Sequence, residues 1–159
     1  MNLILFFTRG ISLKIWHESG LLDREKKIYE HHLKDQNLKK VYWITYGLDD
    51  LKLSEKLKRK KKIHKNIIIL PIPKFLKIFK FSYILYSLFV PFYYSKIIKK
   101  SDILKTNQID GSWSALISKW FFKKKLLLRS GYILSQLENS KNQKGLRYGL
   151  FKLIEKIIF

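Results

Sequence analysis

Several features that define familiar classes of protein are missing from this sequence. It contains no cysteine, which excludes disulfide bonds and thiolate metal sites and is compatible with a reducing compartment. A metal ion would have to be held by carboxylates and the four histidines. The adjacent His31 and His32 would point about 100° apart in a helix, which makes them poor joint ligands, and we predict no metal site.

Targeting and membrane-spanning signals are also missing. The apolar run Leu3–Thr8 has no positive residue before it and no small-residue cleavage site after it, unlike a signal peptide. The uncharged stretch 81–94 is shorter than the roughly 18 to 20 residues that a spanning helix needs. We therefore predict a cytoplasmic protein without a transmembrane segment.

Acidic residues are scarce, since 12 Asp and Glu stand against 33 Lys and Arg and leave a net charge of +21. No acidic residue lies between Glu55 and Asp102. Such an excess favours a polyanionic partner, which could be nucleic acid, an anionic membrane face or a phosphorylated substrate. Nearly all of the excess is lysine, alongside abundant Ile, Phe and Asn, so the codon bias of an AT-rich genome explains it equally well.

Apolar runs of strand length alternate with helical patterns along the chain. The runs are mostly continuous, as in strands covered on both faces, and lie at Leu3–Thr8, Val41–Tyr46, Asn66–Leu70, Asp102–Thr106 and Lys125–Arg129. Helices are predicted at 21–38, 51–62, 111–122 and 146–158. The alternation predicts one α/β domain with a parallel sheet over residues 1–159.

Two of the expected helices have recognisable apolar faces. On or beside one face of 21–38 lie Leu22, Glu25, Ile28, Tyr29, His32 and Leu33. The apolar stripe of 111–122 consists of Trp113, Leu116, Ile117, Trp120 and Phe121. Asp110 is positioned to cap the second helix.

Open parallel sheets bind ligands beyond the carboxyl ends of their strands, so the loops there hold the candidate site residues. Arg9 and Gly10 follow the first strand and would suit a phosphate or sugar hydroxyls, although a plain turn explains them equally well. Trp16 would stack on a sugar ring beside an acid/base pair, His17 and Glu18. In the alternative interpretation, Trp16 closes the end of the domain and the other two are solvated.

Polar residues also follow two later strands. After the fourth come Asn107, Gln108 and Asp110, and after the fifth come Arg129, Gly131 and Tyr132. The first group precedes a helix whose N-terminus favours an anionic group, although helix capping explains Asp110 as well. Arg129 is the candidate for binding a diphosphate or an acceptor carboxylate, with a structural salt bridge as the alternative.

Lysine-rich segments form a further candidate surface. The first contains Lys58, Arg59, Lys60, Lys61 and Lys62, and the second contains Lys74, Lys77 and Lys80 ahead of the apolar stretch 81–94. Helices of this composition can lie in a membrane interface with their lysines on anionic headgroups. The alternative is a core helix at 81–94 with solvated lysines at its ends.

Four segments, taken in order, resemble the first part of a set of bacterial glycosyltransferases. They are SLKIWHESGLLDRE at 12–25, WITYG at 43–47, DILKTNQIDGSW at 102–113 and LRSGY at 128–132. Together they span nearly the whole chain and resemble the N-terminal domain of GT-B-fold enzymes of glycosyltransferase family 4. This chain carries His17 and Ser130 where that family tends to have Asp and Cys.

The resemblance implies a Rossmann-like domain that faces a second domain across an acceptor cleft. The second domain would hold most of the nucleotide-sugar donor, and transfer would retain the anomeric configuration with neither metal nor cofactor. The implied role is addition of a sugar to a glycan or lipid-linked acceptor in cell-surface polysaccharide or lipopolysaccharide assembly. The implied place is the inner face of the cytoplasmic membrane.

The sequence ends at Phe159, before the last strands of such a domain and before its donor-binding half. We therefore expect no complete catalysis by this chain alone, with the second domain on a separate chain or with the chain an inactive fragment. A basic nucleic-acid-binding module is the other alternative, since lysines and the 11 Phe, 9 Tyr and 4 Trp could hold single strands. No RRM, KH or zinc signature supports it.

Overall fold

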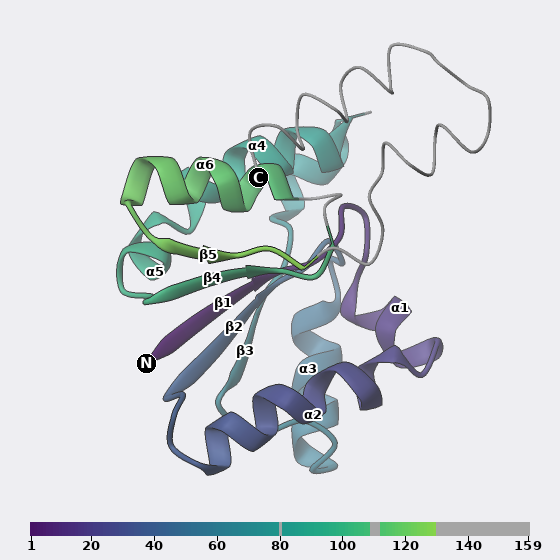
Figure 1. Cartoon of the computed structure of the whole chain (residues 1–159). Helices are drawn as coiled ribbons and strands as arrows, with labels where there is room; N and C mark the ends of the chain where they lie inside the picture. Colours follow the sequence, from purple (N-terminus) through teal and green to yellow (C-terminus); the bar gives the residue numbers. More distant parts are fainter. Residues whose placement is uncertain (80, 109–111, 130–159) are drawn as a thin grey trace, which may run out of the picture. The chain divides into compact units, whose positions relative to one another are not determined.

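Five short strands form one parallel sheet in the computed structural model, which describes residues 1–79, 81–108 and 112–129. The strands are β1 (Asn2–Phe6), β2 (Lys40–Ile44), β3 (Ile67–Leu70), β4 (Ile103–Thr106) and β5 (Lys125–Leu127). Their order across the sheet is β3-β2-β1-β4-β5 (Figure 1). The predicted α/β class is confirmed, and the sheet is Rossmann-like.

The chain adds strands first on one side of β1 and then on the other. Leu3 is paired with Val41 of β2 on one side and with Ile103 of β4 on the other, and all the pairings are parallel. The chain therefore builds outward from β1 to β3 and then returns to build β4 and β5. This reversal makes the carboxyl ends of β1 and β4 the place where an open sheet binds its ligand.

Helices cover both faces of the sheet (Figure 1). One layer consists of α1 (Leu13–Glu18), α2 (Leu21–Lys34) and α3 (Asp50–Arg59). The other consists of the 3-10 helix η1 (Lys74–Ile78) and of α4 (Ser82–Tyr93), α5 (Ser95–Lys99) and α6 (Ser112–Phe122). Because side chains alternate along a strand, Leu5 packs into the core under α1–α3 and Ile4 into the core under α4–α6.

The predicted helices α2 and α3 are confirmed, with ends that fall earlier than expected. Leu22, Glu25, Tyr29 and Leu33 of α2 are buried at helical spacing, as the sequence pattern predicts. After α2 the chain turns at Gln36, and after α3 it turns at Lys61, both with positive φ. At the second turn the N–H of Lys62 donates to the carbonyl of Leu57, which closes the helix as in a Schellman motif.

Three short helices lie in stretches where the sequence pattern predicts none, and they are α1, η1 and α5. In α1, the Ser12 side chain caps the N-terminus by accepting a hydrogen bond from the N–H of Ile15 at 3.1 Å. Leu13 and Trp16 are its buried residues. Six residues are too few to show a helical period, which is why the sequence pattern does not predict α1.

The helices α4 and α6 expose many large apolar side chains, and α6 buries small ones. The buried residues of α6 are Ser112, Ser114, Ala115 and Ser118, so the stripe that contains Trp120 and Phe121 is not its buried face. The exposed apolar residues of the pair form what we call the outer apolar surface. They are Ile84, Leu85, Leu88, Phe89, Phe92 and Tyr93 of α4, with Trp120 and Phe121 of α6.

The helix α4 corresponds to the uncharged stretch 81–94, and it is only partly a core helix. Tyr86 and Val90 are fully buried against the sheet, whereas the opposite side of the helix belongs to the outer apolar surface. No helix in the described ranges is both long and apolar enough for a membrane crossing. The helix expected at 146–158 and the cap expected at Asp110 lie outside the described residues.

Candidate functional site

Backbone hydrogen bonds tie together the loops at the carboxyl edge of the sheet. Phe7 donates to the carbonyl of Ile44 at 3.1 Å, and Asn107 donates to the carbonyl of Phe6 at 3.0 Å. Tyr46 donates to the carbonyl of Ile11 at 3.1 Å. The chain beyond β1 is thus bonded directly to the chain beyond β2, and the first residue after β4 is bonded to the end of β1.

The buried carboxylate of Asp50 fixes the loop after β1 against the loop after β2. Asp50 is only 2% exposed and accepts hydrogen bonds from the N–H groups of Leu13 at 2.9 Å, Lys14 at 3.4 Å and Gly47 at 3.2 Å. A Cβ atom on Gly47 would lie 2.3 Å from the carboxylate. Glycine at position 47 is therefore required by the close approach of Asp50.

A groove of about 280 Å³ lies between these two loops. Its lining includes His17 and Glu18 together with Ser12, Lys14, Asp49 and Asp50. The His17 side chain is half-buried, and the exposed Glu18 pairs with Lys14 at 3.7 Å. The structure therefore brings the proposed acid/base pair into one accessible polar groove.

Trp16 lies in the core instead of in this groove. It is 1% exposed and stacks on Phe7 with ring centroids 3.9 Å apart, while Trp43 meets it edge-on at 5.5 Å. A sugar can stack on an indole only where one face of the ring is exposed. Trp16 therefore closes the end of the domain, as in the alternative interpretation. The prediction that it stacks on a sugar ring was wrong.

The tight turn after β1 contains Arg9 and Gly10. Ile11 donates to the carbonyl of Thr8 at 3.0 Å, and Gly10 has a φ of 79°, which is the glycine position of a type II turn. A Cβ atom on Gly10 would lie 3.6 Å from the Tyr83 ring of α4. Gly10 thus serves the turn, and Arg9 is held half-buried beside it.

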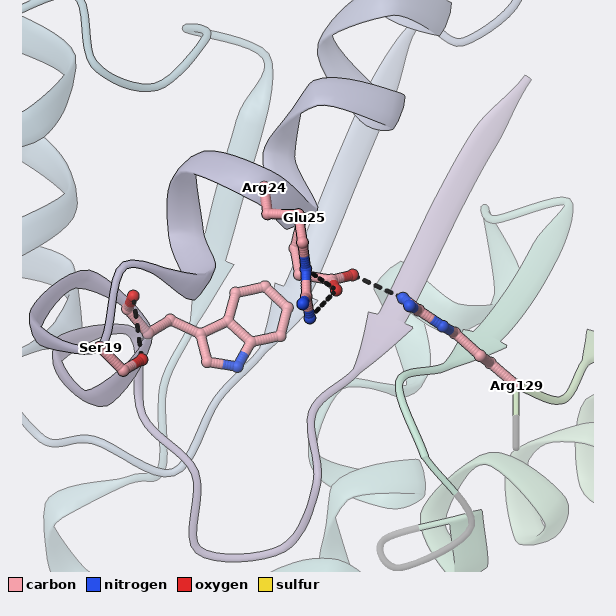
Figure 2. Close-up of polar contacts among 5 residues, drawn as sticks. Ser19, Arg24, Glu25 and Arg129 are labelled. Carbon is pink, nitrogen blue, oxygen red and sulfur yellow. Dashed lines mark hydrogen bonds and ion pairs between the residues drawn. The ribbon is translucent and has the colours of Figure 1, made fainter. Parts of the chain in front are cut away.

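A buried carboxylate with two guanidinium partners joins α2 to the chain after β5. Figure 2 shows the side chains of Arg24, its neighbour in α2, and of Arg129, which follows β5, both directed at the Glu25 carboxylate. Arg129 binds one carboxylate oxygen at 2.6 Å, and Arg24 binds the other at 2.9 Å. The Glu25 side chain is 7% exposed, whereas the Arg129 side chain is 49% exposed. The structural salt bridge expected as the alternative for Arg129 is therefore present.

The charges in this cluster shift each other's pKa. Burial alone would raise the pKa of Glu25, but the hydrogen bonds from Arg129 and Arg24 outweigh it and hold the pKa below the ordinary 4.5. Burial and the neighbouring Arg129 lower the pKa of Lys105 on β4. Its ammonium nitrogen lies 4.9 Å from the centroid of the Tyr29 ring. Two arginines and a lysine around one carboxylate leave an excess of positive charge.

The remaining candidates after β4 and β5 are only partly described. Asn107 is half-buried and Gln108 is exposed at the end of β4. The N–H of Arg129 donates to the Thr106 side chain at 3.2 Å, which ties the ends of β4 and β5 together. Asp110, Gly131 and Tyr132 lie outside the described residues.

The two lysine groups lie on opposite layers of the sheet. Lys58 and Arg59 are in the last turn of α3 and Lys60, Lys61 and Lys62 follow it, whereas Lys74 and Lys77 belong to η1 on the α4 side. Lys80 lies outside the described residues. A flat membrane can meet one layer or the other, so the two groups are separate candidates.

Glu25, Asp50 and Lys105 are charged residues of the site that were not singled out from the sequence as site residues. Glu25 had a usable signal, since a carboxylate at the spacing of Leu22 and Tyr29 on a buried helix face needs a cationic partner. Its partner, Arg129, lies 104 residues away and has no local signal. Asp50 gains its role through Leu13 and Lys14, and Lys105 gains its role through Tyr29 and Arg129, which are all distant in the sequence.

Comparison of the chain with protein-family models, with curated proteins and with solved structures finds no match in any of the three. The Rossmann-like fold is therefore established by the sheet itself. The glycosyltransferase family remains the hypothesis raised by the four sequence segments.

Proposed function

We propose that the chain contains the acceptor-side domain of a sugar-nucleotide-dependent glycosyltransferase of bacterial cell-envelope polysaccharide synthesis. The acceptor is a glycan or a lipid-linked sugar. A second domain, on this or another chain, holds the nucleotide sugar, and transfer retains the anomeric configuration. The proposed site of action is the cytoplasmic side of the membrane.

The observation that carries this proposal is the position of the four segments on which the resemblance depends. The first segment follows β1, the second ends β2, the third contains β4 and the residues after it, and the described part of the fourth follows β5, so all four reach the carboxyl edge of the sheet. Asp50 bonds the first segment to the second, and Arg129 bonds the first and third segments to the fourth. Segments scattered over different faces could not share one ligand, whereas these are in direct contact.

The chemistry of the edge suits an acceptor that joins a sugar to a phosphate. A guanidinium has five N–H donors, and Glu25 engages only one of those of Arg129, so the others can bind phosphate oxygens. In the proposed transfer, the acceptor oxygen bonds to the anomeric carbon and the nucleoside diphosphate leaves. His17 in its polar groove is the candidate to receive the hydroxyl proton.

Titration of the full chain with defined probes, followed by two-dimensional amide NMR, tests the proposal. The probes are a polyprenyl-diphosphate-linked sugar, inorganic pyrophosphate and UDP-glucose. We expect the first two to shift the amides of Asn107 and Arg129, and the donor probe to bind far more weakly. Arg129→Ala should weaken pyrophosphate binding about tenfold, as loss of a charged hydrogen bond does. Arg59→Ala removes an exposed arginine from α3 and should leave binding unchanged.

Other outcomes would contradict the proposal. Tighter binding of UDP-glucose than of either acceptor probe would make this the donor-side domain. Salt-dependent binding of a single-stranded oligonucleotide, without acceptor binding, would identify a nucleic-acid module instead. Equal weakening by Arg129→Ala and Arg59→Ala would show that pyrophosphate responds only to net charge.

A further inference from the structure

The outer apolar surface of α4 and α6 concentrates the exposed apolar side chains of the molecule. Among the described residues, 17 large apolar side chains are exposed. Eight of these make up the outer apolar surface, and Phe75, Phe79 and Phe81 adjoin it. Soluble monomers rarely expose a large contiguous apolar area, and when they do it marks a binding surface.

Ring contacts show that this surface is continuous across three elements. Phe75 of η1 lies 6.3 Å from Phe89 of α4, and Phe89 lies 6.0 Å from Tyr93. Phe92 of α4 meets Phe121 of α6 at 5.3 Å. The exposed rings therefore form one surface that spans the gap between the two helices.

The contact between α4 and α6 explains why the large side chains face outward. The hydroxyl of Ser114 donates to the Ser87 carbonyl at 2.6 Å, and the hydroxyl of Ser87 donates to the Tyr83 carbonyl at 2.8 Å. Ala115 is fully buried. Small residues inside and large apolar residues outside are the arrangement of helices that face lipid.

The charge around the surface has one sign. Residues 74–99 and 112–129, which contain η1, α4, α5, α6 and β5, include no Asp or Glu. Lys74 and Lys77 lie at the η1 end, and Lys119 and Lys123 lie at the end of α6. All four are exposed. A partner must therefore accept apolar groups at the centre and positive charge at the margins.

We propose that the outer apolar surface binds the interface of an anionic lipid bilayer. Ile84, Leu85 and Leu88 would enter the boundary of the acyl chains, and the lysines would lie on anionic headgroups. A second copy of this chain would place lysine against lysine, which opposes self-association. This binding is independent of the proposed transferase, because it requires neither sugar nor nucleotide.

Flotation of the full chain with lipid vesicles tests the proposal. We expect binding to vesicles of phosphatidylcholine mixed with phosphatidylglycerol, weaker binding to phosphatidylcholine alone, and release by salt. Binding should shift the tryptophan emission to shorter wavelength chiefly through Trp120, which is 80% exposed, since Trp16 and Trp43 are buried and Trp113 is half-buried. Trp120→Phe should remove most of the shift and keep the binding.

Serine variants locate the contact. Phe92→Ser and Trp120→Ser should each reduce the partition coefficient about tenfold, because each removes a large inserted side chain. Ile28→Ser of α2 and Leu51→Ser of α3 are matched controls with similar exposure to Phe92, at 48% each against 52%, and should change nothing. Each variant is first checked for unaltered thermal unfolding.

Three results would overturn the proposal. The first is no binding to the anionic vesicles. The second is binding that Lys60→Gln with Lys61→Gln abolishes while Phe92→Ser and Trp120→Ser leave it intact, which would place the contact on the α3 layer. The third is a dimer in sedimentation equilibrium that Phe92→Ser dissociates, with no vesicle binding, which would assign the surface to a second copy.

Discussion

The two helical layers of this domain both cover the sheet, but they differ in which side chains face the sheet and which face outward. In the α1–α3 layer, large apolar side chains such as Trp16, Leu22 and Tyr29 face the sheet, and charged side chains face outward. In the α4–α6 layer, α6 turns serines and Ala115 inward and leaves Trp120 and Phe121 outside. Both layers cover the sheet, but only the first has the surface of a water-soluble protein.

The difference shows that the high positive charge is not one uniform property of the chain. In the α1–α3 layer, lysines are mixed with acidic partners, as in the pair of Lys26 with Asp23 at 2.7 Å. In the α4–α6 layer, lysines border apolar side chains and no acidic residue is present. Compositional bias explains lysine in both layers, whereas only the second combines it with exposed aromatic rings.

The largest expected effect comes from truncating the same residue type in each layer. Trp16→Ala should lower the free energy of unfolding by about 3–5 kcal/mol, as for other large core truncations, because its ring is enclosed by Phe7 and Trp43. Trp120→Ala should change it by less than about 0.5 kcal/mol. Urea denaturation followed by far-UV circular dichroism measures both. A small effect of Trp16→Ala would reopen its role in ligand stacking.

An intermediate effect is expected where α4 and α6 approach each other. Ala115→Leu should destabilise the domain by about 1–3 kcal/mol, since the added atoms overpack a fully buried site. Trp120→Leu on the exposed side of the same helix is the control and should have little effect. If both changes are tolerated equally in urea denaturation, the small residues do not set the helix spacing.

The same contrast explains how much of the fold the sequence could predict. Five strands and the faces of α2 were predictable, because continuous apolar runs and the spacing of Leu22, Tyr29 and Leu33 are local signals. The buried face of α6 was not, because its apolar stripe and its small-residue stripe are both compatible with burial. Packing against α4 selects the small-residue stripe. The spacing of residues along a single helix does not show which neighbour that helix packs against.

The site was predictable to a similar degree. The parallel sheet implies that the loops containing Arg9, His17 and Asn107 share one edge, and they do. The sequence could not separate Trp16 in the core from His17 in the groove, since both lie on one short helix. The pairing of Glu25 with Arg129 depends on the ends of α2 and β5 meeting in space.

The smallest expected effect is a dependence on pH that belongs to the α1–α3 layer alone. Glu25→Gln should lower the free energy of unfolding by about 1–2 kcal/mol near pH 7, because a buried carboxylate loses its charged hydrogen bonds. The folded-state pKa of Glu25 lies below 4.5, so its stabilisation is complete above that pH and is lost as the pH falls through the folded pKa. The difference in free energy of unfolding between wild type and variant should therefore narrow in urea denaturation as the pH falls below 4.5. Glu18→Gln, at an exposed ion pair, should show little effect at either pH. A gap that stays constant with pH would mean that Glu25 acts through packing, and the anion-binding role of Arg129 would then lose its positioning partner.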